Sequence, residues 1–417
     1  MLVHKFGGAL VKSAEAVKNL GNIVGSFTGN MLVVVSAMGK TTNSLEIIAD
    51  HYFNRSGNTY EKLLRLKDYH YEIMHGLFRN KNHLVFDDVN SLFEKLASKL
   101  KTEPSDKYDF EYDQVVSFGE LFSACIISSW LNDSGIKNKW TDARKCLLTN
   151  NVYRDAIVLT EDSKSEVKRI FNFKNENIYV TQGFIGSDKK GNTTTLGREG
   201  SDYSASILAY LLNAEKVIIW KDVEGIFNID PCLHNNPEKL DEISYQEAIE
   251  LAYYGAKVIH PKTIKPLQNK NIPLYVKSFL EPEKQGTVIH EIDHPVQLVP
   301  VYIFKKNQVL ISLSPKDFSF IAEENISSIF ALIAKYHAKV NLLQNSAISL
   351  SVCIDFDERK SPLLIRELKK NYRVLYNENT ELITIRHYNE KAIAGLLGDR
   401  IILLEQKSRL TAQFVVK

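Results

Sequence analysis

Short apolar runs recur along the first part of the chain and alternate with segments of helical periodicity. These runs lie at residues 31–37, 178–186, 216–223 and 272–278. They are nearly continuous in hydrophobicity, which is typical of strands buried on both faces. Residues 201–214 and 244–256 instead repeat apolar positions with the period of a helix, and Ser201 and Ser244 are predicted N-caps. The pattern predicts an α/β fold with a mostly parallel sheet sandwiched by helices.

The chain opens with a predicted strand at residues 2–6, followed by Gly7 and Gly8 and by a helix that begins near Ser13. One interpretation is an ordinary glycine turn between a strand and a helix. The other is a turn that presents backbone N–H groups to an anion, with Lys5 as a charge beside it. Local sequence does not decide between them. In both, Lys5 is predicted to be a surface charge at a strand end.

Residues 43–135 are poor in strands and rich in charged helical periodicity, so they form a predicted helical insertion within a first domain at 1–292. A second pattern begins after a proline-containing connector. Its order is strand, helix, two strands, helix and strand, and it spans residues 300–380. That order is the split, ferredoxin-like βαββαβ motif. Residues 381–417 give only β-α-β-β, one helix and one strand short of a second copy.

Separate strands are predicted at 372–376 and 381–388 in this region, with the module boundary between them.

Composition and charge narrow the classes of function. The 417 residues contain 52 basic and 50 acidic side chains, so the net charge is only +2 and there is no excess of positive charge to attract a polyanion. Nucleic acid is therefore not an expected partner. The four cysteines are far apart and form no CxxC pair, which argues against a zinc ribbon or a disulfide framework. No apolar run approaches the ~20 residues of a membrane span, and no signal peptide is visible. A cytoplasmic protein is expected.

Two further turns contain candidate anion-binding chemistry. The segment SAMGKTT (36–42) lacks a Walker A loop, because Val34 stands where that motif needs its first glycine. The segment 193–206 places Arg198 between Gly197 and Gly200 at the start of a helix. A planar guanidinium suits a carboxylate, and flanking glycines allow close approach of a small ligand. Taken alone, Ser201 and Asp202 are better explained by ordinary helix capping, whereas Arg198 between two glycines at the same helix start favours a ligand site.

Two acidic segments remain open to more than one interpretation. Glu120 begins an apolar helix, where it would compensate the helix dipole or bind a substrate ammonium. The stretch 218–231 is a buried strand that runs into an acidic loop, in the position where open α/β sheets bind ligands. Asp222 and Asp230 are also acceptable as simple turn residues.

Taken together, these motifs resemble an aspartate kinase of the amino acid kinase family over essentially the whole chain, with ACT-type modules at the C-terminus. The stretches that resemble the family, in its order, are KFGG (5–8), VVVSAMGKTTN (33–43), SFGE (117–120), QGFIG (182–186), TTLGREGSDYSA (194–205), WKDVEGIFNIDP (220–231) and GAKVIHP (255–261). The resemblance implies ATP-dependent phosphorylation of L-aspartate to 4-phospho-L-aspartate, the first step toward lysine, threonine and methionine. ATP would bring Mg²⁺ with it.

The resemblance also implies roles for particular residues. Lys5 would neutralise charge on the phosphoryl group in transfer, with Asp202 holding it in place. Arg198 would bind the α-carboxylate of aspartate and Glu120 its α-ammonium, with Thr42 near the same substrate. The phosphate path and the nucleotide would be bordered by Gly7, Gly8, Ser36, Lys221, Asp222, Phe227 and Lys257. No metal-ligating residues of the protein are implied.

The chain departs from the family pattern at several positions. The family commonly has KFGGTSV and RGGSD, whereas this chain has Ala9-Leu10 and Glu199, and Cys232 stands where an arginine is frequent. Glu199 is tolerable beside the substrate only if its side chain points outward. In the first ACT-type module, Asn341 and Ala347 replace acids of lysine-inhibited relatives, which predicts weak or absent lysine inhibition.

Two alternative functions stay open. One is a kinase for another small acid, such as glutamate or an acyl-glutamate. The other is a catalytically weak amino-acid sensor that uses its ACT-type modules to bind a partner. A homodimer joined through residues 300–417 is expected in either case, because an open sheet edge is normally covered. Neither nucleic acid nor a membrane is expected as a partner.

Overall fold

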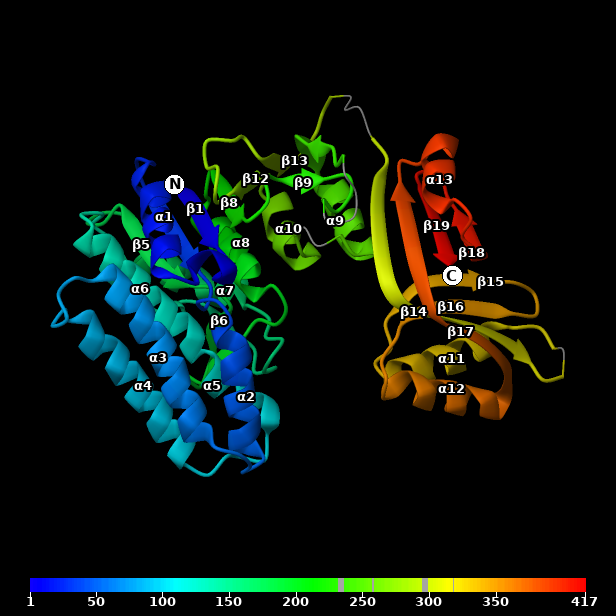
Figure 1. Ribbon diagram of the computed structural model, residues 1–417, viewed down its shortest axis with the longest axis horizontal. Coiled ribbons are helices and arrows are strands. Elements are labelled where there is room, and N and C mark those ends of the chain that lie inside the picture. The colour runs from blue at the N-terminus through cyan, green and yellow to red at the C-terminus, as the bar shows by residue number, and fades with distance from the viewer. Residues whose placement is uncertain (232–235, 257–258, 295–298, 318) are drawn as a thin grey trace. The chain divides into compact units, whose positions relative to one another are not determined.

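The computed structural model describes residues 1–231, 236–256, 259–294, 299–317 and 319–417 (Figure 1). The chain divides into two compact units. The first comprises residues 1–226, 239–249 and 259–293, and the second comprises 227–238, 250–258 and 294–417. The short strands β9 (Ile226–Phe227) and β10 (Lys239–Leu240) lie where the chain passes between the units.

An eight-stranded sheet forms the centre of the first unit. In sheet order its strands are β11 (Glu242–Ser244), β13 (Thr287–His290), β12 (Leu274–Ser278), β8 (Lys216–Lys221), β1 (Leu2–Phe6), β2 (Met31–Val35), β5 (Ile178–Gln182) and β3 (Lys139–Thr141). From β12 to β3 all neighbouring pairs are parallel, whereas β13 is antiparallel to β12. The four apolar runs became β2, β5, β8 and β12, so the mostly parallel sheet is confirmed.

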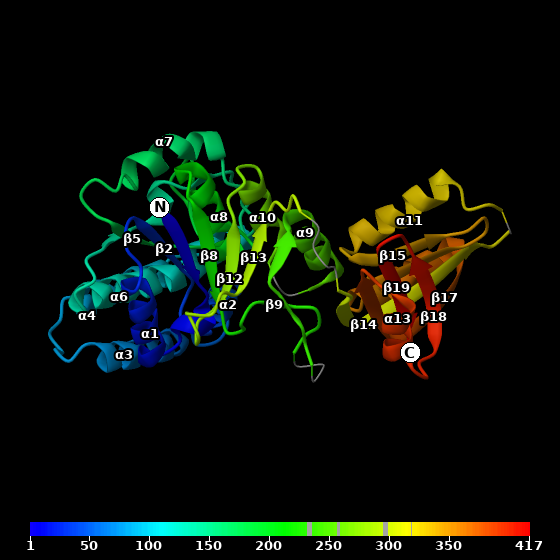
Figure 2. The same cartoon turned by 90° about the horizontal axis from the view of Figure 1, so that it is seen from above.

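Helices cover both faces of this sheet. Figure 2 shows α7, α8 and α10 on one face and α1, α3, α4 and α6 on the other. The helical elements of the first unit are η1 (Gly8–Val11), α1 (Ala14–Gly25), α2 (Thr41–Phe53), α3 (Thr59–Leu77), α4 (Val85–Lys101), α5 (Tyr108–Val116), α6 (Phe118–Asp133), η2 (Ala143–Lys145), α7 (Thr160–Ile170), α8 (Gly200–Leu212), α10 (Pro261–Gln268) and the first part of α9 (Tyr245–Tyr254). Helix α1 begins next to Ser13 as predicted, and the side chain of Ser13 caps it by accepting a hydrogen bond from Ala16 N.

The predicted helical insertion corresponds to α2 through α6. Residues 108–133, which contain α5 and α6, are long and apolar enough to cross a membrane by length and composition alone. However, 78% of the apolar 18-residue stretch within this segment is buried inside the protein. Helix α6 contacts β2, β3 and β5 on one side and α1, α3 and α4 on the other, so its apolar surface is explained by packing.

A small sheet lies beside this insertion. It contains β4 (Leu148–Thr149), β6 (Ile185–Asp188) and β7 (Thr193–Thr195), in which β6 and β7 form a hairpin. Helix α5 packs against β7. Strand β7 leads directly into the segment that contains Arg198.

The second unit is built on a six-stranded sheet. Its strands, in sheet order, are β15 (Val340–Asn345), β16 (Leu350–Asp355), β14 (Val301–Pro315), β17 (Tyr372–Arg386), β19 (Thr411–Val416) and β18 (Ile402–Lys407). Its helices are α11 (Glu323–Lys335), α12 (Lys360–Asn371) and α13 (Glu390–Leu397). The chain order from β14 to β17 is the predicted βαββαβ.

The separate strands predicted at 372–376 and 381–388 are wrong, because β17 is one strand of 15 residues. Strand β14 also has 15 residues and pairs with β17 along most of its length. Together these two strands contribute to one hydrophobic core under α11 and α12, to another under α13, and to a third that includes Leu310 and Leu382.

Candidate active site

Three turns meet at one edge of the large sheet. Phe6, the last residue of β1, lies opposite Val35 of β2 and Trp220 of β8, and all three strands are parallel. The residues that follow them, from Gly7, Ser36 and Lys221 onward, therefore lie at the same carboxyl edge. Ligands bind at this edge in open α/β sheets.

The turns after β1 and β2 pack closely on each other. Gly39 N donates to Gly8 O at 2.9 Å, and Ser36 N donates to Phe6 O at 3.1 Å. A Cβ atom on Gly8 would lie 2.4 Å from Ala37 O, so this position admits only glycine. The glycine pair is thus required by close approach of two backbones at the ligand-binding edge, and Gly7, Gly8 and Ser36 are all partly accessible.

A buried ion cluster lies beside these turns. Lys5 Nζ is 2.6 Å from Asp202 Oδ1, and Lys221 Nζ is 3.4 Å from Asp202 Oδ2. Burial by itself would raise the pKa of Asp202, but the ammonium groups of Lys5 and Lys221 outweigh burial and hold this pKa below its ordinary value. The prediction that Lys5 is a surface charge is wrong, since only 7% of the residue is exposed.

Glu120 lies at the start of α6 and is almost completely buried. Its Oε1 accepts a hydrogen bond from Ala37 N at 3.2 Å, while Oε2 has no hydrogen-bond partner among the described residues. Burial raises the pKa of Glu120 to about 8, although the Ala37 N–H and the charge of Lys5 act in the opposite direction. A buried carboxylate oxygen without a partner is costly, and a cationic group of a ligand would satisfy it.

The first turn of α2 borders the same region. Thr42 is half-buried there. The neighbouring Thr41 is buried, and its Oγ1 is 3.4 Å from Nε2 of His70 on α3. Because Nδ1 of His70 lies 2.8 Å from Leu66 O and donates to it, Nε2 accepts from Thr41. Burial lowers the pKa of His70 to about 4, so this histidine is neutral and structural.

The segment from Leu196 to Gly200 presents Arg198 at the N-terminus of α8. Gly197 has φ +76°, and a Cβ atom on it would lie 2.7 Å from Asp155 Oδ1. Glu199 has φ +54° and is the N-cap residue, so the prediction of Ser201 as N-cap is wrong by two positions. The side chains of Arg198 and Glu199 are both exposed, and Arg198 makes no hydrogen bond or ion pair within the described part of the chain.

The remaining predicted residues are distributed less compactly. Asp222 is exposed just after the end of β8, next to Lys221. Phe227 belongs to the second unit. Lys257 and Cys232 lie outside the described residues, so their predicted roles stay predictions.

Sequence reasoning missed two residues that shape the site. Phe184 follows Gly183 with φ +65°, and its N–H and C=O are bonded to Ser204 Oγ and Leu196 N at 2.9 Å. Asp113, buried on α5, accepts hydrogen bonds from Thr195 and from Arg154 N. The only local signal for Phe184 is that a bulky residue follows a glycine. No feature of the neighbouring sequence indicates the role of Asp113.

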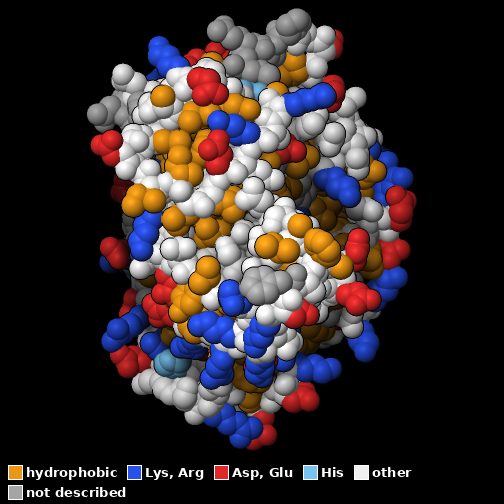
Figure 3. Space-filling view, turned by 90° about the vertical axis from the view of Figure 1, so that its right-hand side faces the viewer, with side chains coloured by type: hydrophobic (Ala, Val, Ile, Leu, Met, Phe, Trp, Pro, Cys, Tyr) orange, Lys and Arg blue, Asp and Glu red, His pale blue; other side chains and the backbone are white. Residues whose placement is uncertain are grey.

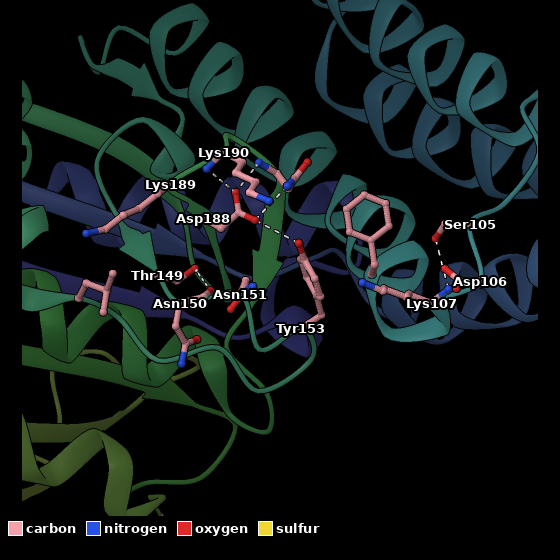
Figure 4. Close-up of a pocket in the computed structure, with 13 residues that line it drawn as sticks. Ser105, Asp106, Lys107, Thr149, Asn150, Asn151, Tyr153, Asp188, Lys189 and Lys190 are labelled. Carbon is pink, nitrogen blue, oxygen red and sulfur yellow. Dashed lines mark hydrogen bonds between the residues drawn. The ribbon is translucent and has the colours of Figure 1, made fainter.

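A cavity of about 500 Å³ lies elsewhere in the first unit, where residues 105–110, residues 149–153 and the β6–β7 hairpin meet (Figure 4). In it, Asp188 accepts hydrogen bonds from the hydroxyl of Tyr153 at 3.0 Å and from the side chain of Asn192 at 2.9 Å. None of the predicted site residues that the structure describes lines this cavity. Among the described residues, no cluster of three or more His, Cys, Asp or Glu side chains could hold a metal ion.

Comparison with protein families and curated proteins agrees with this geometry. A model described as the amino acid kinase family matches residues 1–278. The chain is 32% identical over 402 residues to the lysine-sensitive aspartokinase 3 of Escherichia coli (strain K12), covering 92% of this chain and 86% of that protein. It is 26% identical over 413 residues to the chloroplastic aspartokinase 1 of Arabidopsis thaliana, covering 95% of this chain and 70% of that one.

Solved structures give the same result. E. coli aspartokinase III in complex with lysine and aspartate, in the T-state, superposes with a TM-score of 0.84 at 29% identity. The same enzyme in complex with aspartate and ADP, in the R-state, gives a TM-score of 0.82 at 28% identity. Both comparisons cover 100% of this chain and 96% of the other.

Proposed function

The chain belongs to the amino acid kinase family, and within it to the aspartokinases, and from this premise we propose that it transfers the γ-phosphoryl group of ATP to the side-chain carboxylate of L-aspartate. The products are 4-phospho-L-aspartate and ADP. The observation that supports this most strongly is the buried cluster of Lys5, Asp202 and Glu120 at the carboxyl edge of the sheet. It combines a cation suited to phosphate with a carboxylate suited to an ammonium.

The chemistry requires little of the protein beyond positioning and charge. An oxygen of the substrate carboxylate attacks the γ-phosphorus, and the bond from that phosphorus to the bridging oxygen of ADP breaks. A carboxylate is already a nucleophile, so no general base is needed. Lys5 neutralises the charge that spreads over the transferring group, and Asp202 holds its ammonium at the end of β1.

The acceptor would be bound by groups of opposite charge. Arg198, which is free of protein partners within the described chain, would donate two hydrogen bonds to the α-carboxylate of aspartate. Glu120 would accept from the α-ammonium through Oε2, and Thr42 would border the same substrate. Glu199 is exposed, so its charge does not have to be buried beside the bound substrate.

The nucleotide would lie along the sheet edge. The backbone of Gly7 and Gly8, together with Ser36, would border its phosphates, and Lys221 and Asp222 would border the rest. Phe227 and Lys257 stay proposed nucleotide neighbours by resemblance. Mg²⁺ would supply further charge neutralisation and would be held by the nucleotide phosphates, since Asp202 is already engaged by two ammonium groups.

The proposal is tested by coupled ADP release with L-aspartate, with L-glutamate and with no acceptor. Trapping the acyl phosphate with hydroxylamine identifies the product. We expect turnover that depends on aspartate. A preference for glutamate would favour another acid kinase, and no acceptor-dependent turnover would favour an amino-acid sensor.

The aspartate KM should depend on pH. Because the pKa of Glu120 is about 8, this carboxyl is largely neutral at lower pH and must lose its proton to bind an ammonium. We therefore expect the KM for aspartate to fall roughly tenfold per unit as pH rises from about 6 to about 8, and then to level off. The measurement is a series of initial rates at saturating ATP.

Comparison with Glu120→Gln assigns this effect. Asp113, whose pKa burial raises to about 7, titrates in a similar range, so the wild-type profile alone is ambiguous. The Glu120→Gln variant should have a high KM for aspartate at every pH, and this KM should no longer fall as the pH approaches 8. A wild-type KM that is independent of pH would contradict the role of Glu120.

Residues 300–417 are the proposed homodimer interface. Strand β15 is an edge of the six-stranded sheet, and such edges are normally covered. Figure 3 shows the side of the second unit, where hydrophobic side chains lie among charged ones. Phe320, Leu375 and Ile401 are exposed on this unit. Sedimentation of the full chain tests the dimer. Leu343→Lys, in the edge strand β15, should weaken it.

Lysine is expected to leave the activity almost unchanged. Asn341 stands where lysine-inhibited relatives have an acid, and its oxygen already accepts a hydrogen bond from Lys305 Nζ at 2.8 Å. Its amide donates to Gln308 and to Asp355 at 2.7 Å. Ala347 is exposed and offers no carboxylate. Residues 341 and 347 themselves offer no carboxylate to a second ammonium, which would also meet the charge of Lys305.

The measurement is a titration of lysine against aspartate-dependent ATP turnover, with threonine and methionine as parallel effectors. Asn341→Asp combined with Lys305→Met restores an acid and removes the competing cation, so this variant should gain sensitivity. Strong inhibition of the wild type by submillimolar lysine would refute the argument.

A further inference from the structure

Asp113 occupies an unusual position for a carboxylate. It is completely buried on α5, in the helical insertion, yet all described hydrogen-bond partners of its carboxylate lie outside this helix. Its Oδ2 accepts from Thr195 N at 2.8 Å, and its Oδ1 accepts from Thr195 Oγ1 at 2.7 Å. Arg154 N donates to both oxygens at 3.1 and 3.2 Å. The donors are neutral, so the cost of burying the charge is offset only by these hydrogen bonds.

Thr195 and Arg154, which donate hydrogen bonds to Asp113, are both connected to the segment around Arg198. Thr195 is the last residue of β7, and Leu196 N then donates to Phe184 O at 2.9 Å. Arg154 precedes Asp155, and these two residues form the wall against which Gly197 packs. The carboxylate therefore joins the two backbones that enclose residue 197, one residue before Arg198.

The guanidinium of Arg154 does not take part in this link. It pairs with Asp109 at 3.1 Å and lies 4.4 Å from the ring centre of Tyr112. Arg154 itself has φ +66°, a conformation that is unfavourable for a side chain larger than glycine. Its N–H is held in place by Asp113, so the carboxylate also stabilises a strained turn.

We propose that Asp113 is a positioning residue for substrate binding, which fixes the backbone of residues 196–200 so that Arg198 meets the α-carboxylate of aspartate. This inference rests on the proposed function, in which Arg198 binds that group. Asp113 itself touches no substrate. Displacement of a binding group by even an ångström is costly, so loss of this support should appear in aspartate affinity.

The test compares two buried acids on the same helix. Asp113→Asn preserves the shape but turns one acceptor into a donor that faces N–H groups. Glu111→Gln is the matched control, because Glu111 is equally buried but binds Ser105 N and Lys99, away from β7. We expect Asp113→Asn to raise the KM for aspartate at least tenfold and to change the KM for ATP less than twofold. Glu111→Gln should change neither.

A second readout needs no catalysis. Hydrogen exchange of peptides covering residues 193–204 should be faster in Asp113→Asn and unchanged in Glu111→Gln, with melting temperatures recorded for both. If Asp113→Asn does not fold, Thr195→Val removes only the hydroxyl bond, and Thr195→Ser retains it. The valine variant should then raise the aspartate KM, and the serine variant should not.

The outcomes separate the two proposals. Equal effects of Asp113→Asn and Glu111→Gln on aspartate KM, or equal changes in the two KM values, would overturn the positioning role. A wild-type enzyme without aspartate turnover would overturn the proposed function instead. In that case unchanged exchange at residues 193–204 would still refute the role of Asp113 in fixing this segment.

Discussion

Replacing Lys5 by alanine is expected to lower kcat by about a hundredfold or more. Lys5 lies at the end of β1, with its ammonium 2.6 Å from Asp202 and close enough to Glu120 to lower the pKa of that group. A fixed charge aimed at the transferring phosphoryl group lowers the barrier by several kcal/mol, which corresponds to a factor of ~10² to 10³ in rate. Steady-state kinetics at saturating ATP and aspartate measure the effect.

The same substitution should also reduce stability. Removing Lys5 leaves the buried carboxylate of Asp202 with Lys221 alone, at 3.4 Å and partly exposed. Breaking a buried ion pair from one side typically costs about 3–5 kcal/mol. Lys139→Ala is the control, because Lys139 is an exposed lysine at the start of β3. It should change neither kcat nor the melting temperature.

A double variant separates the two effects. Lys5→Ala combined with Asp202→Ala removes both charges, so we expect it to recover most of the lost melting temperature and none of the lost activity. Activity close to wild type in either variant would exclude Lys5 from phosphoryl transfer. A loss of activity that is reversed together with stability would show that Lys5 acts only through the fold.

Much of the fold could be predicted from the sequence because its strands are buried on both faces. Nearly continuous apolar runs such as 31–37 and 216–223 then stand out from the helices between them, and β2 and β8 lie within them. Parallel strands place their carboxyl ends at one edge. The convergence of Gly7, Ser36 and Lys221 therefore follows from strand assignment alone.

The environment of each site residue was harder to predict. Whether Lys5 is a surface charge or a buried one depends on Asp202, which is 197 residues away in the chain and is brought to it by the packing of α8 on β1. The bond from Asp113 to Thr195 spans 82 residues and joins the helical insertion to a small sheet. No periodic pattern encodes such a pairing.

Local rules also failed where the backbone adopts an uncommon conformation. Ser201 looks like an N-cap, but α8 begins earlier because Glu199 takes a left-handed conformation. The break predicted between 376 and 381 does not occur, because β17 continues through these polar residues and stays paired with β14 on both sides of a local register shift. In both cases a tertiary requirement overrides the propensity of the residues.

Arg198→Lys is expected to raise the KM for aspartate by about ten- to a hundredfold while changing the KM for ATP little. The substitution keeps the positive charge but removes the planar fork that donates two parallel hydrogen bonds to a carboxylate. Each charge-assisted hydrogen bond contributes about 1.5–3 kcal/mol, so the loss of one accounts for an effect of this size. Separate titrations of aspartate and ATP measure it.

This result is informative because Arg198 does not contribute to the fold through contacts of its side chain. It is exposed and makes no hydrogen bond or ion pair within the described part of the chain, so the lysine variant should keep the wild-type melting temperature. Arg169→Lys provides the control, since Arg169 is an exposed arginine on α7 that pairs with Glu166. It should leave both KM values unchanged.

The pattern of the two KM values decides the role of Arg198. If it binds the α-carboxylate, the aspartate KM rises alone, and an acceptor that lacks this carboxylate should lose its dependence on residue 198. An equal rise for aspartate and ATP would move Arg198 to the phosphates, where a point charge serves as well as a fork. An unchanged aspartate KM would leave Glu120 as the remaining proposed charged group for recognising the amino acid, and a single buried carboxylate cannot by itself distinguish aspartate from any other small amine.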